Sequence, residues 1–161
     1  MANPLSNIFD SLSASLKKMA GIEPAEQRIA LEKLQLQQSV ATLLYETART
    51  DHEVKDEDIE VANECLCQLL ALSTEQAQAL LTHAAQPHQR PTSYHPLVKA
   101  INEQCSVEQK YHLVECMWRV AHADHEIDMY EDHLVRKISE LLYVPHRDFI
   151  AAKHRARERS S

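Results

Sequence analysis

Carboxylates are concentrated in two short segments of this chain, and each segment also carries a histidine. The first segment contains Asp51, His52, Glu53 and Asp56. The second segment contains Asp124, His125, Glu126, Asp128 and Glu131. Clustered carboxylate oxygens are the ligands that hard divalent cations prefer, and they also attract the basic side chains of a partner protein. These segments are named the acidic loops and are candidate cation-binding or partner-binding sites.

The second acidic loop has the more regular spacing of potential metal ligands. Its carboxylates recur at Asp124, Glu126, Asp128 and Glu131. Oxygen ligands in this number favour Ca²⁺ or Mg²⁺ over Zn²⁺ as the cation. The loop is not an EF-hand, because Met129 stands where the sixth position needs glycine and Val135 where the twelfth needs glutamate.

A zinc site is the weaker interpretation of the histidines. His122 and His125 are three residues apart, but the loop is expected to end the helix between them. His133 lies on the following predicted helix, and no H-E-x-x-H motif is present. We therefore expect solvated histidines rather than zinc ligands.

Helix capping is the main role that we expect for the loop carboxylates. Asp128 and Glu131 match the N-cap and N3 positions of a following helix, and Asp56 can cap the corresponding helix of the first half. Acidic residues at helix N-termini also complement the helix dipole, by about 0.3–1 kcal/mol each. Val54 and Ile127 would anchor the loops in the core, and a weak metal site can coexist with the caps.

Nucleophilic catalysis has little support. The cysteines are predicted to be reduced, buried and mostly structural thiols of an intracellular protein: Cys65, Cys67, Cys105 and Cys116. Cys65 and Cys67 are two residues apart on a predicted helix and therefore point to different faces. Cys116 and His112 share a helix face, but the sequence supplies no third group to orient the histidine. The single glycine excludes a Walker A loop, a dinucleotide fingerprint and a G-x-S-x-G elbow, so we do not expect an enzyme.

Helices are predicted to position all of these residues. Apolar residues recur at helical spacing, and Ser73 and Ser106 each begin a capping box. The expected fold class is all-α, a compact seven- to eight-helix bundle built from two related halves with pseudo-twofold symmetry. The halves span about 34–85 and 107–157, and a proline-containing connector at 86–96 joins them.

An amphipathic helix is predicted within residues 1–22, ahead of a single helical domain at 23–161. Its apolar face includes Phe9, Leu12 and Leu16, whereas its polar face carries mostly serine. Packing on the domain, or a loose attachment to it, is therefore favoured over reversible membrane contact. No apolar run approaches the roughly 18–20 residues of a membrane span. We expect a cytoplasmic protein, and the inner face of the membrane is the alternative location.

The charge balance argues against a nucleic-acid partner. The chain has 17 basic and 24 acidic residues and a net charge of −7, whereas nucleic-acid binding needs a basic surface. The ten histidines make this charge sensitive to mild acid. A protein partner is therefore expected instead.

The two acidic loops belong to an internal repeat. Residues 48–54 read ARTDHEV, and residues 121–127 read AHADHEI, 73 positions later. Beyond the loops, Leu66 and Leu70 match Ile138 and Leu142 at a spacing of 72. The repeated unit is a helix, an acidic loop, a second helix and a short helix.

At these residues the chain resembles the TerB-like family, named after tellurite-resistance protein B. The resemblance rests mainly on AHADHEID at 121–128 and LLYVP at 141–145, and it covers about 34–156. It implies a compact all-α bundle whose acidic loops usually begin Ala-Asp-Gly. Here His52 and His125 occupy the glycine position, where a left-handed histidine is feasible. Members occur in tellurite-resistance clusters, and a related domain belongs to a membrane-bound DnaJ-type co-chaperone.

The residues and the resemblance together predict a non-enzymatic, stress-associated binding or adaptor domain. Its acidic loops would contact a protein partner or a divalent cation. The alternative is a metal sensor or a metal-dependent enzyme that uses the segment from Asp124 to His133.

Overall fold

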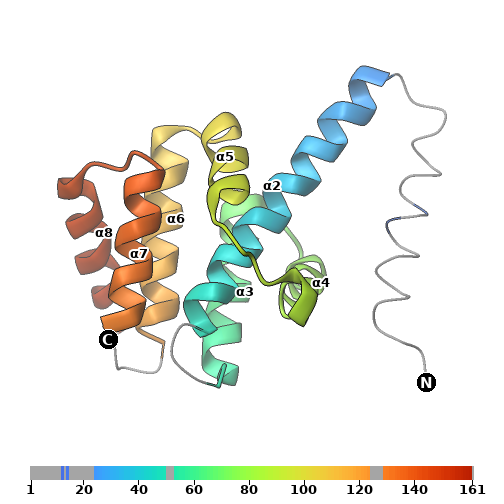
Figure 1. Ribbon diagram of the computed structural model, residues 1–161. Coiled ribbons are helices and arrows are strands. Elements are labelled where there is room, and N and C mark those ends of the chain that lie inside the picture. The colour runs from blue at the N-terminus through green and yellow to red at the C-terminus, as the bar shows by residue number, and fades with distance from the viewer. Residues whose placement is uncertain (1–11, 13, 15–23, 50–52, 124–128, 161) are drawn as a thin grey trace.

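The computed structural model describes residues 12, 14, 24–49, 53–123 and 129–160. Seven α-helices make up most of the described residues, and these residues contain no strand (Figure 1). The prediction of an all-α bundle is therefore confirmed. The α-helices are α2 (Pro24–Arg49), α3 (Asp56–Leu70), α4 (Thr74–Ala84), α5 (His95–Gln104), α6 (Val107–Ala121), α7 (Met129–Leu141) and α8 (His146–Arg159). A 3₁₀ turn, η1 (Pro87–Gln89), lies in the predicted connector.

Capping boxes begin α4 and α6, as the sequence predicts. The Ser73 hydroxyl accepts the Gln76 N–H at 3.2 Å, and the Gln76 side chain accepts the Ser73 N–H at 2.9 Å. Ser106 and Gln109 form the same pair of bonds at 3.2 and 2.8 Å. These bonds satisfy N–H groups that have no partner within the helix, so local sequence sets both helix starts.

The start of α3 differs from the prediction. Its N-cap is Lys55, and Asp56 is already the first helical residue, so the assignment of Asp56 as the cap is wrong. Asp58, the third helical residue, accepts the Lys55 N–H at 3.0 Å. A side chain at this N3 position can reach back to the cap residue, whereas Asp56 faces solvent.

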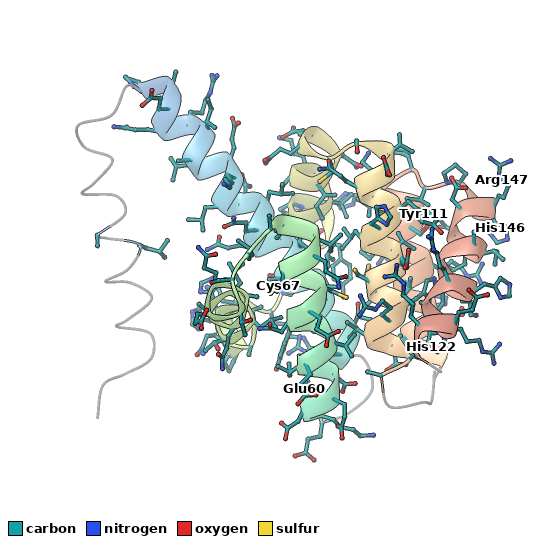
Figure 2. All side chains as sticks on the ribbon, turned by 180° about the vertical axis from the view of Figure 1, so that it is seen from behind. Glu60, Cys67, Tyr111, His122, His146 and Arg147 are labelled. Carbon is teal, nitrogen blue, oxygen red and sulfur yellow. The ribbon has the colours of Figure 1, made fainter. Side chains whose placement is uncertain are left out.

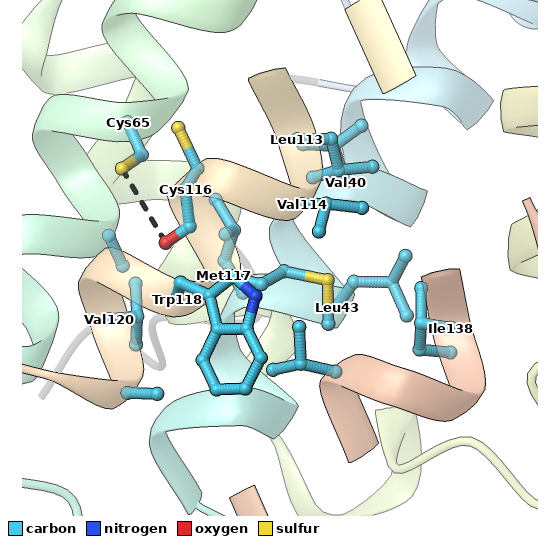
Figure 3. Close-up of a cluster of buried hydrophobic side chains, with 14 of the residues drawn as sticks. Val40, Leu43, Cys65, Leu113, Val114, Cys116, Met117, Trp118, Val120 and Ile138 are labelled. Atoms are coloured by element: carbon cyan, nitrogen blue, oxygen red, sulfur yellow. Dashed lines mark hydrogen bonds between the residues drawn. The ribbon is translucent and has the colours of Figure 1, made fainter. Parts of the chain in front are cut away.

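The core is largely aliphatic and surrounds the single tryptophan of the chain (Figure 3). Trp118 of α6 is fully buried, and its ring lies 5.4 Å from that of Phe149 on α8. Leu43 of α2 and Ile138 of α7 are also fully buried in this cluster. Helix α6 contacts α2, α3, α7 and α8, so one core spans both predicted halves.

The first half of α2 extends beyond the bundle (Figure 1). Ile29 and Leu31 are 60% and 50% exposed, and the buried part of the helix begins at Ser39. The Gln104 side chain of α5 donates a hydrogen bond to the Glu32 carbonyl at 2.9 Å. The apolar periodicity of α2 therefore continues past the part that the core buries.

Helices α3 and α7 end in the same way. Ala71 and Tyr143, 72 positions apart, have left-handed backbone angles, with φ of 51° and 59°. In both, the N–H of the next residue bonds to the carbonyl five residues back, at 3.3 Å after α3 and 3.0 Å after α7. The pseudo-twofold relation between the halves stays a prediction, and this pair of helix ends supports it.

The predicted N-terminal helix lies almost wholly outside the described residues. Only Leu12 and Ala14 of that segment are described, and both are helical. The division into residues 1–22 and 23–161 therefore stays a prediction. Among the described helices, none combines the length and the apolar character that crossing a membrane would require.

Candidate functional site

The described helix ends that flank both acidic loops lie at one end of the bundle (Figure 1). Helices α2 and α6 end there, and α3 and α7 begin there. The last turn of α8 reaches the same end. This region is named the acidic end, and its described acidic residues at and near the starts of α3 and α7 are Glu53, Asp56, Glu57, Asp58, Glu60, Glu131 and Asp132.

Exposed carboxylates of the acidic end cluster around the start of α3. Glu53 and Asp56, two of the predicted site residues, are exposed, and Glu57 is exposed beside them. Glu60, one turn further along α3, is exposed as well, and Figure 2 shows it near this end of the helix. Val54 packs against the core, which confirms the predicted anchor of the first loop. This set of carboxylates is free to meet a basic surface.

Two carboxylates of the acidic end are buried instead. Asp58 is 6% exposed and Glu131 is 8% exposed. Each is the third residue of its helix, and they are 73 positions apart. Both take part in polar interactions within the fold. Asp58 therefore holds the start of α3 in place, which is the kind of structural role expected for loop carboxylates.

The remaining predicted site residues lie outside the described part of the chain. They are Asp51, His52, Asp124, His125, Glu126 and Asp128, together with the predicted anchor Ile127. The assignment of Asp128 as an N-cap therefore stays a prediction. The same is true of the four cation ligands predicted for the second loop: Asp124, Glu126, Asp128 and Glu131.

Next to Glu131, Asp132 belongs to an ion-pair cluster. Its carboxylate lies 3.0 Å from Lys153 of α8 and 3.5 Å from Arg136. Burial acts to raise the pKa of Asp132, but the hydrogen bond from Lys153 and the Arg136 charge outweigh it and lower the pKa. The Lys153 ammonium also lies 4.7 Å from the Trp118 ring centroid. This cluster ties the start of α7 to α8.

His122 caps the C-terminal end of α6 at the acidic end (Figure 2). Its ring lies 6.1 Å from the Trp118 ring. Burial lowers the pKa of His122, and the charges of Arg157 and Lys153 lower it further. His133 is exposed on α7. Within the described ranges, no group of three or more His, Cys, Asp or Glu side chains is arranged to hold a metal ion.

A second feature, which the sequence did not reveal, is a pocket of about 370 Å³ between α3, α6 and α8. It is lined by Gln68, Leu69, Gln109, His112, Glu115, Cys116 and Arg159. Glu115 is 3% exposed and lies 3.4 Å from Arg159 and 3.8 Å from His112. The sequence does contain one signal for this pocket: the helical spacing places His112, Glu115 and Cys116 on one face of α6.

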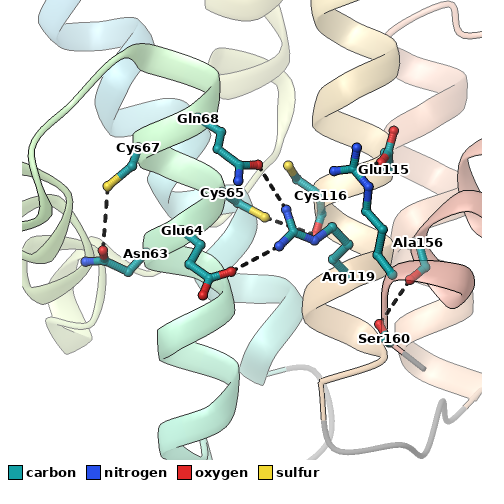
Figure 4. A network of polar contacts seen from close by, with 11 residues as sticks. Asn63, Glu64, Cys65, Cys67, Gln68, Glu115, Cys116, Arg119, Ala156 and Ser160 are labelled. Carbon is teal, nitrogen blue, oxygen red and sulfur yellow. Dashed lines mark hydrogen bonds and ion pairs between the residues drawn. The ribbon is translucent and has the colours of Figure 1, made fainter.

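The four cysteines are free thiols. Cys65 and Cys116 are buried as predicted, but Cys67 and Cys105 are only partly buried, so the prediction of burial is wrong for these two. Cys65 is buried, and Cys67 points to another side of α3, where its thiol lies 3.7 Å from the Asn63 side chain (Figure 4). The predicted divergence of these two thiols is confirmed. Cys65 instead faces Cys116 of α6, a residue 51 positions away.

These features define an all-α helical bundle with carboxylates gathered at one end. The family model for tellurite resistance protein TerB matches residues 37–154, which include all of α3 to α7, the second half of α2 and most of α8. The chain therefore belongs to the TerB family, as its acidic loops indicated. No curated protein and no solved structure matches it.

Proposed function

We propose that this TerB-family chain is a non-enzymatic binding or adaptor domain of a cytoplasmic stress response, and that its acidic end contacts a protein partner. The observation that carries the proposal is the placement of the helix ends flanking both acidic loops at one end of the bundle. Helices fix the spacing of these carboxylates, and preorganised charge lowers the cost of binding. The expected partner presents lysine and arginine side chains, which complement this end of the bundle.

The family name suggests tellurite resistance as the setting for this binding. A tellurite-sensitive host that expresses the full chain should then grow at higher tellurite concentrations than the host alone. Equal growth of the two cultures, with the protein present at normal abundance, would count against this setting but leave the binding surface to its own test.

Charge removal at the acidic end tests the partner proposal. The variant Glu53→Gln/Asp56→Asn removes two exposed carboxylates of the acidic end. The matched control, Glu103→Gln/Glu108→Gln, removes two exposed carboxylates at the end of α5 and the start of α6. Both variants should keep the native fluorescence of the buried tryptophan.

Cross-linking followed by quantitative mass spectrometry gives the readout. We expect a partner that is lost with the acidic-end variant, is kept with the control, and binds more weakly as salt concentration rises. Equal recovery of every partner by both variants would refute the acidic end as the binding surface.

A divalent-cation site at the second acidic loop is the alternative function. The observation that favours it is the regular spacing of four carboxylates in the sequence, at Asp124, Glu126, Asp128 and Glu131. An increase in the unfolding temperature with Ca²⁺ or Mg²⁺, absent in the variant Asp124→Asn/Asp128→Asn, would support it. No shift with millimolar Ca²⁺, Mg²⁺, Mn²⁺ or Zn²⁺ relative to chelator would exclude both a metal sensor and a metal-dependent enzyme. If this variant is less stable than the wild type in the absence of metal, the result would support a helix-capping role for the loop carboxylates.

A further inference from the structure

Two thiols from different parts of the chain face each other between α3 and α6 (Figures 3 and 4). Cys65 of α3 is fully buried, and Cys116 of α6 is 6% exposed. The Cys65 thiol donates a hydrogen bond to the Cys116 carbonyl oxygen, which lies 4.0 Å from the Cys65 sulfur, and it also interacts with the Cys116 thiol. The positions of both thiols are fixed by the helix packing around them.

A guanidinium lies beside this pair (Figure 4). Arg119, one turn along α6 from Cys116, is held by Gln68 and Glu64, each at 3.1 Å. Its charge favours a thiolate over a thiol at a neighbouring cysteine. Two carboxylates oppose this effect. Glu64 forms an ion pair with Arg119 at 3.1 Å and acts to raise the pKa of Cys65. The buried Glu115, which adjoins Cys116 in the chain and lies near Arg159, acts to raise the pKa of Cys116.

The two thiols differ in acidity. The hydrogen bond from Cys65 lowers the pKa of Cys116, and Arg119 lowers it further against the opposing effects of burial and Glu115. The same hydrogen bond and burial raise the pKa of Cys65. Cys116 is therefore the more readily ionised sulfur, and Cys65 keeps its proton.

Access to the two thiols differs in the same direction. Cys116 lines the 370 Å³ pocket between α3, α6 and α8, whereas Cys65 does not. The other lining side chains are mostly polar or charged, including Gln109 and His112. A small polar oxidant can therefore reach Cys116 through the pocket, while Cys65 stays behind it.

We propose that Cys65 and Cys116 form a peroxide-reactive thiol pair, which closes to a disulfide between α3 and α6. The Cys116 sulfur attacks a peroxide oxygen, the O–O bond breaks, and the leaving hydroxide takes up a proton to become water. Cys116 is oxidised to a sulfenic acid, and the peroxide is reduced. The Cys65 sulfur then attacks the Cys116 sulfur, the S–O bond breaks, and the departing hydroxide leaves as water with the Cys65 proton.

The product would join the two halves of the bundle covalently, and it does not depend on the acidic end. The other two cysteines supply internal controls. Cys67 lies on another side of α3 near Asn63, and Cys105 is half-buried at the end of α5, where burial raises its pKa. Both should react more slowly than Cys116.

Treatment of the reduced full chain with hydrogen peroxide, followed by alkylation and peptide mapping, tests the proposal. We expect a disulfide that links Cys65 to Cys116, a higher unfolding temperature, and reversal of both by dithiothreitol. Cys67→Ser and Cys105→Ser should keep this cross-link. Cys65→Ser should stop the reaction at a Cys116 sulfenic acid that dimedone traps, and Cys116→Ser should abolish it.

The electrostatic step has a separate test. Arg119→Gln should slow the loss of the first thiol several-fold while circular dichroism remains native. The proposal fails if the wild-type peptide map shows no Cys65–Cys116 link, or if Cys67 or Cys105 is oxidised first. The wild-type map decides the question even if Cys65→Ser does not fold.

Discussion

Single carboxylates at the acidic end have different surroundings and therefore different roles. Asp56 is exposed at the first position of α3, where it can meet a partner. Asp58, two residues on, is buried and accepts the Lys55 N–H. A lost acceptor leaves a backbone donor without its partner, whereas a lost surface charge changes mainly the long-range field.

Alanine substitution at these two positions should separate the roles. Asp58→Ala should lower the free energy of unfolding by roughly 1–2 kcal/mol, because the Lys55 N–H loses its acceptor. Asp56→Ala, the matched control, should change it by less than about 0.5 kcal/mol. Urea denaturation monitored by Trp118 fluorescence measures both values, and equal losses would contradict the distinction.

His122 makes the stability of the fold depend on pH. Its pKa is lowered in the folded state, so the unfolded chain binds the proton more readily near the ordinary value of 6.5. The contribution of His122 to the free energy of unfolding is therefore fully present above pH 6.5. It is lost as the pH falls from 6.5 through the lower pKa of His122 in the folded state. Asp132, whose pKa is lowered from 3.8, contributes stability above that value and loses it in stronger acid as the pH falls through the folded pKa.

Replacement of His122 should reduce the first of these two pH effects. His122→Gln should lose less unfolding free energy than the wild type between about pH 7.5 and pH 5.5. Denaturant melts at a series of pH values measure the difference. His95→Gln, at an exposed site that begins α5, is the control. An unchanged slope in His122→Gln would show that other groups control stability in this range.

Helix ends dominate the behaviour of individual elements in a chain with one glycine. The left-handed residues that end α3 and α7 are Ala71 and Tyr143, positions where glycine is the usual choice. A side chain in this conformation crowds the backbone and carries a conformational cost. Both ends keep the closing hydrogen bond of the motif, which offsets part of that cost.

Glycine at one of these positions should therefore stabilise the fold. Ala71→Gly should raise the free energy of unfolding by roughly 0.5–1 kcal/mol, because the left-handed backbone is no longer opposed by a side chain. Ala79→Gly, at an exposed position within α4, should lower it by about the same amount. Thermal and urea melts of both variants check the signs, and destabilisation by both would contradict the argument.

At the scale of the whole molecule, α6 joins the two predicted halves into one core. It carries Trp118 and Met117, both fully buried, and it contacts α2 and α3 as well as α7 and α8. Removal of α6 would expose the apolar faces of four helices. We therefore expect the folding of each half to depend on the other.

Separated halves should consequently fail to fold alone. Fragments 24–105 and 106–160 should each show reduced helicity and no cooperative unfolding, because each lacks the apolar surface that the other buries. An equimolar mixture should regain helicity and the fluorescence of buried Trp118. Cooperative melting of 24–105 by itself would show instead that the first half is an independent domain.

Features that depend on neighbouring residues were predictable from the chain. The capping boxes at Ser73 and Ser106, the all-α class and the family membership follow from spacings of three or four residues and from a repeated motif. Hydrogen bonds and apolar periodicity within one helix act over such short separations, so local sequence contains the information.

Other features needed the packing of helices against each other. The burial of Asp58 beside exposed Asp56, the pocket next to Glu115, and the pairing of Cys65 with Cys116 depend on how far each helix is rotated and shifted on its neighbour. A rotation of one residue turns a side chain about 100° around its helix, from core to solvent. The chain therefore specifies its helices and its family locally, whereas the contacts between residues 51 positions apart arise from interhelical packing, which depends on the side chains of all the helices together.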